Sequence, residues 1–174
     1  MSVRFTADDE TLRPMGRATS GVIGMRFREG DELLAMDTVR PDAYVVTVTD
    51  GGYAKRTPVD DWTPKGRGIY GVRAMKLVQE RGSLVGALVA SEDDEVYAIA
   101  SDGVVIRTRV SEIRATGRDT MGVVFARFDE DDNIIGLAKN TERNLETNAD
   151  GLEDLDGEDV ETPQNAEATE GAAE

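Results

Sequence analysis

The residues of this chain that could do chemistry are arginines held in a repeated glycine frame. The pattern Gly-Arg, three variable residues, Gly-Val occurs at 16–22, 66–72 and 117–123, so its first glycines lie 50 and 51 residues apart. An arginine stays charged at physiological pH and offers a planar fork of N–H donors, which suits phosphate oxygens and backbone carbonyls alike. The spacing therefore predicts a repeated unit of about 50 residues with one such arginine in each copy.

The composition excludes most catalytic and metal-binding chemistry. The chain has 174 residues and contains no cysteine and no histidine. These absences remove disulfides, thiolate nucleophiles, the commonest general base and the commonest transition-metal ligand. The acidic runs at 129–133 and 154–159 lack the spacing of an EF-hand calcium loop. We predict no catalytic residue, no metal site and no cofactor bound by this chain.

Short runs of alternating hydrophobicity lie between the Gly-Arg motifs. They are rich in Val, Ile, Leu and Met, and clusters of Asp and Gly separate them, which is typical of β-strands joined by tight turns. Arg-Thr pairs at 56–57 and 107–108 each follow an Asp-Gly turn, and Arg4 aligns with the arginines of these pairs. Four such strands in about 50 residues are the content of one propeller blade.

We therefore predict an all-β fold, a propeller-like repeat of four-stranded blades. Its units lie at roughly 1–43, 44–94 and 95–140. Because Met1 would fall inside a strand, we expect an incomplete first unit, about two and a half blades in all, and a C-terminal fragment of a longer protein. The chain has no apolar run that could span a bilayer and no signal peptide, so we expect a cytoplasmic location and no membrane partner.

The acidic charge of the chain belongs mostly to its end. Of a formal net charge of −15, residues 140–174 carry −11, from 12 acidic residues and Arg143, and residues 1–139 carry −4. The end of the chain has no aromatic residue and few branched ones, which predicts a disordered acidic tail at 141–174. Such a tail either keeps the protein soluble or competes with an anionic ligand for a basic surface beside it.

The order of the motifs resembles one known family. The order is an Arg-Thr pair after a glycine turn, then the Gly-Arg-x-x-x-Gly-Val motif, then a strand of the type GDELLA, found at 30–35. Over roughly residues 1–140 this order resembles the C-terminal domain of the DNA gyrase A protein. The resemblance implies a β-pinwheel, a propeller-like ring whose outer rim binds, bends and wraps DNA. It implies a non-catalytic part of a type IIA topoisomerase that introduces negative supercoils with ATP.

The same resemblance places the rest of the machinery outside this chain. It implies that the catalytic tyrosine and the ATPase, with its ATP and Mg²⁺, lie elsewhere, and that the partners are the rest of the gyrase A protein and the gyrase B protein in an A2B2 complex. The family's basic heptapeptide of the type Q-R-R-G-G-K-G is absent from this sequence. The equivalent C-terminal domain of topoisomerase IV and a propeller for protein–protein contact therefore remain alternatives.

Basic stretches recur once per blade in the two later units. The net charge is +3 over residues 50–91 and again +3 over residues 103–128. Cations spaced along a convex surface bind DNA by neutralising phosphates, without reading bases. The arginines of the Gly-Arg motif have an alternative role, because they could instead cap backbone carbonyls of a neighbouring blade. We predict that double-stranded DNA is contacted by Arg4, Arg17, Lys55, Arg56, Lys65, Arg67, Arg73, Lys76, Arg107, Arg109 and Arg118.

Overall fold

The computed structural model describes residues 1–127 and 132–141, so the predicted acidic tail from residue 142 onward lies outside the described residues. Met1–Asn140 form one compact unit. Its regular elements are seven β-strands and three single-turn 3₁₀ helices, and the described residues contain no α-helix. The all-β prediction is confirmed.

The first sheet has four strands. Its order is β3-β1-β2-β6, and all neighbours are antiparallel. A tight turn with Gly52 at φ 79° joins β1 to β2, where the sequence predicted an Asp-Gly turn. Alternate residues of β1, Val46 and Val48, are buried in the core. The strands are β1 (Tyr44–Thr49), β2 (Tyr53–Pro58), β3 (Leu84–Ala90) and β6 (Val123–Val124).

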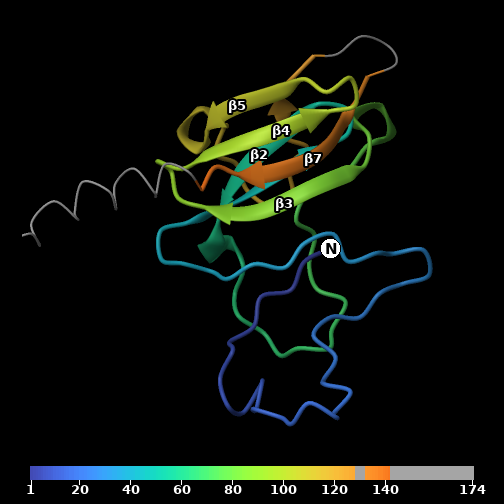
Figure 1. The fold of residues 1–174 in the computed structure, drawn as a ribbon, viewed down its shortest axis with the longest axis vertical. Coiled ribbons are helices and arrows are strands. Elements are labelled where there is room, and N and C mark those ends of the chain that lie inside the picture. Colours follow the sequence, from blue (N-terminus) through green and yellow to red (C-terminus); the bar gives the residue numbers. More distant parts are fainter. Residues whose placement is uncertain (128–131, 142–174) are drawn as a thin grey trace, which may run out of the picture. The chain divides into compact units, whose positions relative to one another are not determined.

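The second sheet repeats the hairpin of the first. It consists of β4 (Glu95–Ala100), β5 (Val105–Arg109) and β7 (Ile134–Lys139), in the order β5-β4-β7 and antiparallel throughout (Figure 1). Gly103, at φ 89°, stands in the turn between β4 and β5. The two sheets share one hydrophobic core, in which Val46 of the first sheet and Val96 and Ile134 of the second are buried.

Neighbouring units are joined by a shared strand. β6 begins at Val123, the last residue of the third Gly-Arg motif, and pairs with β2 of the preceding unit, with Ala54 opposite Val123. One unit earlier, Ser2 forms the corresponding bridge with Val72. The Gly-Val segments of the second and third units therefore pair with the segment that carries Arg4 or Arg56 in the unit before. This pairing brings the Gly-Arg turn of one unit against the Arg-Thr strand of its neighbour.

Several predicted strands are shorter in the structure or absent from it. The run after the second Gly-Val pair makes only the bridge at Val72, and the run after the third makes only the two residues of β6. The chain bends there because the N–H groups of Phe125 and Ala126 both turn to the carbonyl of Gly52. This bend ends the ladder after one or two residues.

Residues 1–43 contain no strand (Figure 1). The strand-like runs that the sequence places after the first Gly-Arg motif, at 22–27 and 33–36, are therefore not strands in the structure. Residues 1–43 form only the isolated bridges of Ser2 and Met25. A strand needs a ladder partner, and the two runs pair with no strand among the described residues. Their apolar side chains are correspondingly exposed, with Met36 at 91%.

Candidate nucleic-acid interface

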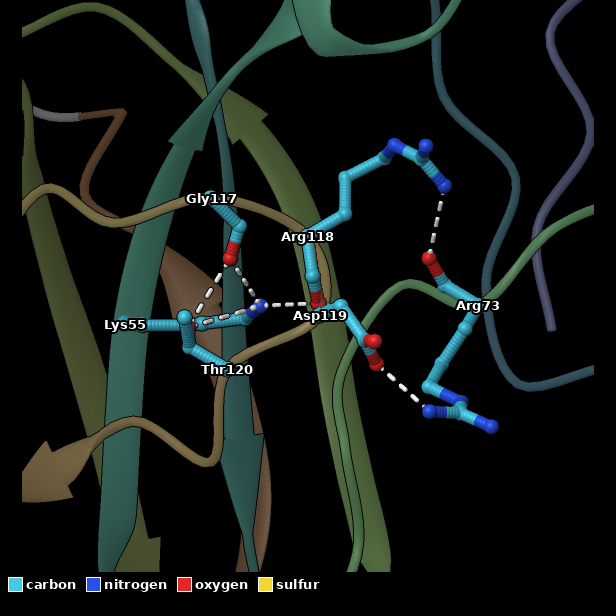
Figure 2. A network of polar contacts seen from close by, with 6 residues as sticks. All are labelled: Lys55, Arg73, Gly117, Arg118, Asp119 and Thr120. Carbon is cyan, nitrogen blue, oxygen red and sulfur yellow. Dashed lines mark hydrogen bonds and ion pairs between the residues drawn. The ribbon is translucent and has the colours of Figure 1, made fainter.

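Lys55 lies at the junction between the second and third units and is completely buried. Its ammonium donates hydrogen bonds to the carbonyl oxygens of Gly117, at 2.8 Å, and Arg118, at 2.6 Å (Figure 2). Burial lowers the pKa of Lys55 from 10.5 to about 8, and the carboxylates of Asp119 and Asp61 oppose this shift. The side chain therefore clamps the third Gly-Arg turn onto β2 and offers no surface to a phosphate.

Arg56, next to Lys55 on β2, is also a structural cation. It is 8% exposed, and its Nε donates to the carbonyl of Ile113 at 2.8 Å. Its Nη2 pairs with Glu92 at 2.7 Å, and its guanidinium lies 4.4 Å from the ring centroid of Tyr44. These contacts fix the 3₁₀ turn that follows β5 (Val110–Glu112) and engage Nε and Nη2, whereas Nη1 is buried without a hydrogen-bond partner among the described residues.

Arg4 and Arg107, which the repeat aligns with Arg56, lie in different environments. Arg4 is half-buried and donates to the carbonyls of Val59 and Trp62 at 2.8 and 3.0 Å, so it braces the first unit against the second. Arg107 donates two hydrogen bonds to one carboxylate oxygen of Glu95, and its side chain remains 60% exposed. Arg109 extends beside the same carboxylate and is 62% exposed.

Two arginines of the Gly-Arg motif cap carbonyls of another unit. Arg67 donates through Nε to Thr11 at 2.9 Å, and Arg118 donates through Nη1 to Arg73 at 3.2 Å (Figure 2). Both side chains stay partly exposed, so part of each guanidinium remains available. Arg17 is exposed and makes no hydrogen bond or ion pair with another residue in the described part of the chain.

The remaining predicted cations, Lys65, Arg73 and Lys76, are exposed on the second unit. Arg73 forms an ion pair with Asp119, and its hydrogen bond is the main reason why the pKa of that carboxyl is lowered (Figure 2). Lys65 makes no hydrogen bond or ion pair through its ammonium with any other described residue. The structure thus divides the eleven predicted residues into buried braces and exposed cations.

Sequence reasoning missed one bracing arginine. Arg81 donates to the carbonyl of Gly122 at 2.8 Å and lies over the ring of Tyr53, 4.5 Å from its centroid. Its position in a charged turn gave no signal of this role. Arg81 therefore joins Lys55 in holding the Gly-Val end of the third motif against β2.

The described part of the chain contains neither a candidate metal site nor a helix that could span a membrane. Within residues 1–127 and 132–141 no group of three or more acidic residues could hold a metal ion. No helix in that same part is long and apolar enough to cross a membrane. The candidate site that remains is the set of predicted cations whose side chains are exposed.

Comparison with known proteins connects this arrangement to a family. The family model of the DNA gyrase C-terminal domain, a β-propeller, matches residues 3–40, 43–91 and 94–140. The DNA gyrase A protein of Streptomyces coelicolor is 56% identical over 175 residues, which cover 99% of this chain and 20% of the relative. Its counterpart in Mycobacterium tuberculosis is 47% identical over 148 residues, which cover 85% and 18%. The chain thus spans about one fifth of these relatives' length.

Solved structures show the same fold. A structure of the DNA gyrase A C-terminal domain matches with a TM-score of 0.66 and 29% identity, over 74% of this chain and 44% of that one. The C-terminal domain of DNA topoisomerase IV matches in fold with a TM-score of 0.71 and 22% identity, over 83% and 47%. The propeller-like prediction and the family resemblance are both confirmed, and the chain belongs to the DNA gyrase C-terminal β-propeller domain family.

Proposed function

We propose that this chain binds and wraps double-stranded DNA as a non-catalytic part of the DNA gyrase A protein. The observation that carries the proposal is the set of cations left exposed once the structural ones are assigned. Lysines and arginines on an open surface neutralise phosphates and release counterions, which gives affinity without base readout. The proposed contacts are Arg17, Lys65, Arg67, Arg73, Lys76, Arg107, Arg109 and Arg118.

Three of the predicted contacts are left out of this surface. Lys55 and Arg56 are buried, and Arg4 directs its Nη1 to two carbonyls of the second unit. A phosphate could reach Lys55 and Arg56 only if the contacts between units opened, and Arg4 uses its Nη1 to brace the units. Their role in DNA binding is therefore indirect, because they position the Gly-Arg turns from which exposed cations project.

The relatives described above favour gyrase over topoisomerase IV, since both are DNA gyrase A proteins. In the whole enzyme we propose that the wrap sets the direction of strand passage during ATP-dependent negative supercoiling. The gyrase A protein would supply the catalytic tyrosine and the gyrase B protein the ATPase, in an A2B2 complex in the cytoplasm.

A bending assay tests the proposal. A duplex labelled at both ends with a fluorophore pair is mixed with the full chain at low salt, and energy transfer between the ends is followed. Wrapping predicts increased transfer, because the ends of a bent duplex approach each other. The control is a double variant, Lys65→Gln with Lys76→Gln, which removes two exposed cations and should bend less. A module for protein–protein contact would leave the transfer unchanged in both cases.

A further inference from the structure

A pocket of about 140 Å³ lies where the three units meet. Its walls come from Ser2, Val3 and Arg4 of the first unit, from residues between 61 and 72 of the second, and from Arg118 of the third. The volume is on the order of the roughly 150 Å³ cavity that accommodates benzene in another protein. A phosphate group is no larger than benzene, so the pocket has room for one.

The frame of this pocket is held by hydrogen bonds between units. Ser2 and Val72 exchange backbone hydrogen bonds of 2.7 and 2.9 Å. The indole N–H of Trp62 donates to the hydroxyl of Ser2 at 2.7 Å, and the N–H of Lys65 donates to the carbonyl of Arg4 at 2.9 Å. A site whose shape is fixed before binding loses little conformational entropy when the ligand arrives.

Positive charge dominates the lining. Three cations, Arg4, Lys65 and Arg118, stand against one carboxylate, Asp61. Arg118 spends one donor on the carbonyl of Arg73 and lies over the Trp62 ring, 5.9 Å from its centroid, with its side chain directed away from the Lys55 clamp (Figure 2). A guanidinium has five N–H donors, so Arg118 keeps donors for a ligand.

We propose that this pocket binds one backbone phosphate of duplex DNA, with Lys65 and Arg118 as its two contacts. The inference rests on the proposed function and narrows it from a basic surface to a site that three units build together. Charge-assisted hydrogen bonds to both cations suit an anion with several acceptor oxygens. Free inorganic phosphate shares this chemistry, but Arg73, Lys76 and Arg67 on the same unit supply the further phosphate contacts that only a polymer can use.

Trp62 provides a direct probe, because it lines the pocket and is the only tryptophan in the chain. The full chain is titrated with a labelled duplex while DNA anisotropy and Trp62 emission are recorded together over a series of salt concentrations. The wild type is compared with Lys65→Gln and with Arg13→Gln. Arg13 is a matched control, since it is also exposed but does not line the pocket. Thermal unfolding checks that both variants fold.

The expected result separates the two variants. Lys65→Gln should make the slope of log K against log[salt] shallower by up to about 0.9, the value for one phosphate no longer neutralised, and should suppress the change in Trp62 emission. Arg13→Gln should leave the slope and the emission change as in the wild type. Equal effects of the two substitutions on the slope, or DNA binding with no emission change in the wild type, would overturn the pocket assignment alone.

An arm with inorganic phosphate at constant ionic strength identifies the source of the anion. The proposal predicts that millimolar phosphate changes the Trp62 emission weakly and that duplex DNA changes it at far lower concentration. A response to phosphate with none to bound DNA would make the pocket a free-anion site and refute the DNA assignment. No DNA binding by the wild type at low salt would overturn the proposed function itself, and the pocket assignment with it.

Discussion

At the scale of single residues, burial separates cations that the sequence presents as equivalent. Lys55 and Lys65 are both lysines of the second unit, yet one is completely buried and the other is exposed. The buried lysine holds two carbonyls of the neighbouring unit, whereas the ammonium of the exposed one is available to DNA. The residue type gives the charge, and the packing of the units determines what that charge contacts.

Replacing the clamp should destabilise the fold. Lys55→Met keeps the length of the side chain but removes the donor to the carbonyls of Gly117 and Arg118. The substitution also removes the cost of burying a charged lysine, which offsets part of the loss. We expect a net decrease of about 1–3 kcal/mol in the free energy of unfolding, as for other groups left without a hydrogen-bond partner. Urea unfolding at pH 7 measures it, with Lys76→Met as the exposed control, expected within about 0.5 kcal/mol of wild type.

The same lysine should make stability depend on pH. Its pKa falls from 10.5 in the unfolded chain to about 8 in the folded one, mainly because of burial. The unfolded state therefore binds more protons between these values, so the free energy of unfolding should rise with pH from about 8 to about 10.5. Below pH 8 the ionisation of Lys55 should add no further pH dependence, because the side chain is protonated in both states. The neutral amine can still donate to the carbonyls. The measurement is the difference in the free energy of unfolding between the wild type and Lys55→Met from about pH 8 to about 10.5. A difference that does not change with pH would contradict the burial of a charged Lys55.

At the scale of elements, the pairing between units explains why the second glycine of the second and of the third Gly-Arg motif must be glycine. At Gly122, with φ +74°, an added Cβ would lie 2.7 Å from the carbonyl oxygen of Ala54 on the preceding unit's strand. Gly71 meets Ser2 in the same way and also has a positive φ. The first glycine of the third motif, Gly117, would place a Cβ no nearer than 3.7 Å to any neighbour.

Substitution within one motif should therefore have unequal effects. Gly122→Ala combines a left-handed backbone with a clash against the backbone of β2, and we expect it to cost about 2–4 kcal/mol. Gly117→Ala has space and no positive φ, so we expect a change of less than about 1 kcal/mol. Urea unfolding of both variants checks this, and equal destabilisation would show that the shared strand does not constrain Gly122.

The sequence predicted the hairpins well because their information is local. The Asp-Gly turn before Arg56 and the one before Arg107 lie where the sequence placed them, since glycine at a positive φ marks such turns. The pairing of β6 with β2 of another unit was not predictable, because periodicity does not say which strand is the partner. The burial of Lys55 was not predictable from the sequence either. A strand with one buried face buries every second residue, whereas residues 54–57 of β2 are all buried, so alternation does not identify Lys55 as a buried side chain.

At the scale of the whole molecule, the balance between the cations of residues 1–140 and the acidic residues beyond them should control DNA affinity. A chain that ends at residue 140 loses 12 acidic residues and Arg143, so its net charge changes from −15 to −4. If the acidic segment competes for the cationic surface, its removal should raise duplex affinity by about tenfold at low salt, because a tethered competitor acts at high effective concentration. Anisotropy with labelled duplex measures this, and unchanged affinity would leave the segment a solubilising role.

The salt dependence of duplex binding by the full chain tests the central claim most directly. Eight cations, six exposed and two partly exposed, form the proposed surface, and each phosphate neutralised contributes about −0.9 to the slope of log K against log[salt]. Engagement of at least half of these cations predicts a slope of about −3.5 or steeper, measured by anisotropy from about 50 to 200 mM salt. A slope near zero, or no binding at the lowest salt, would contradict the assignment of these cations to DNA.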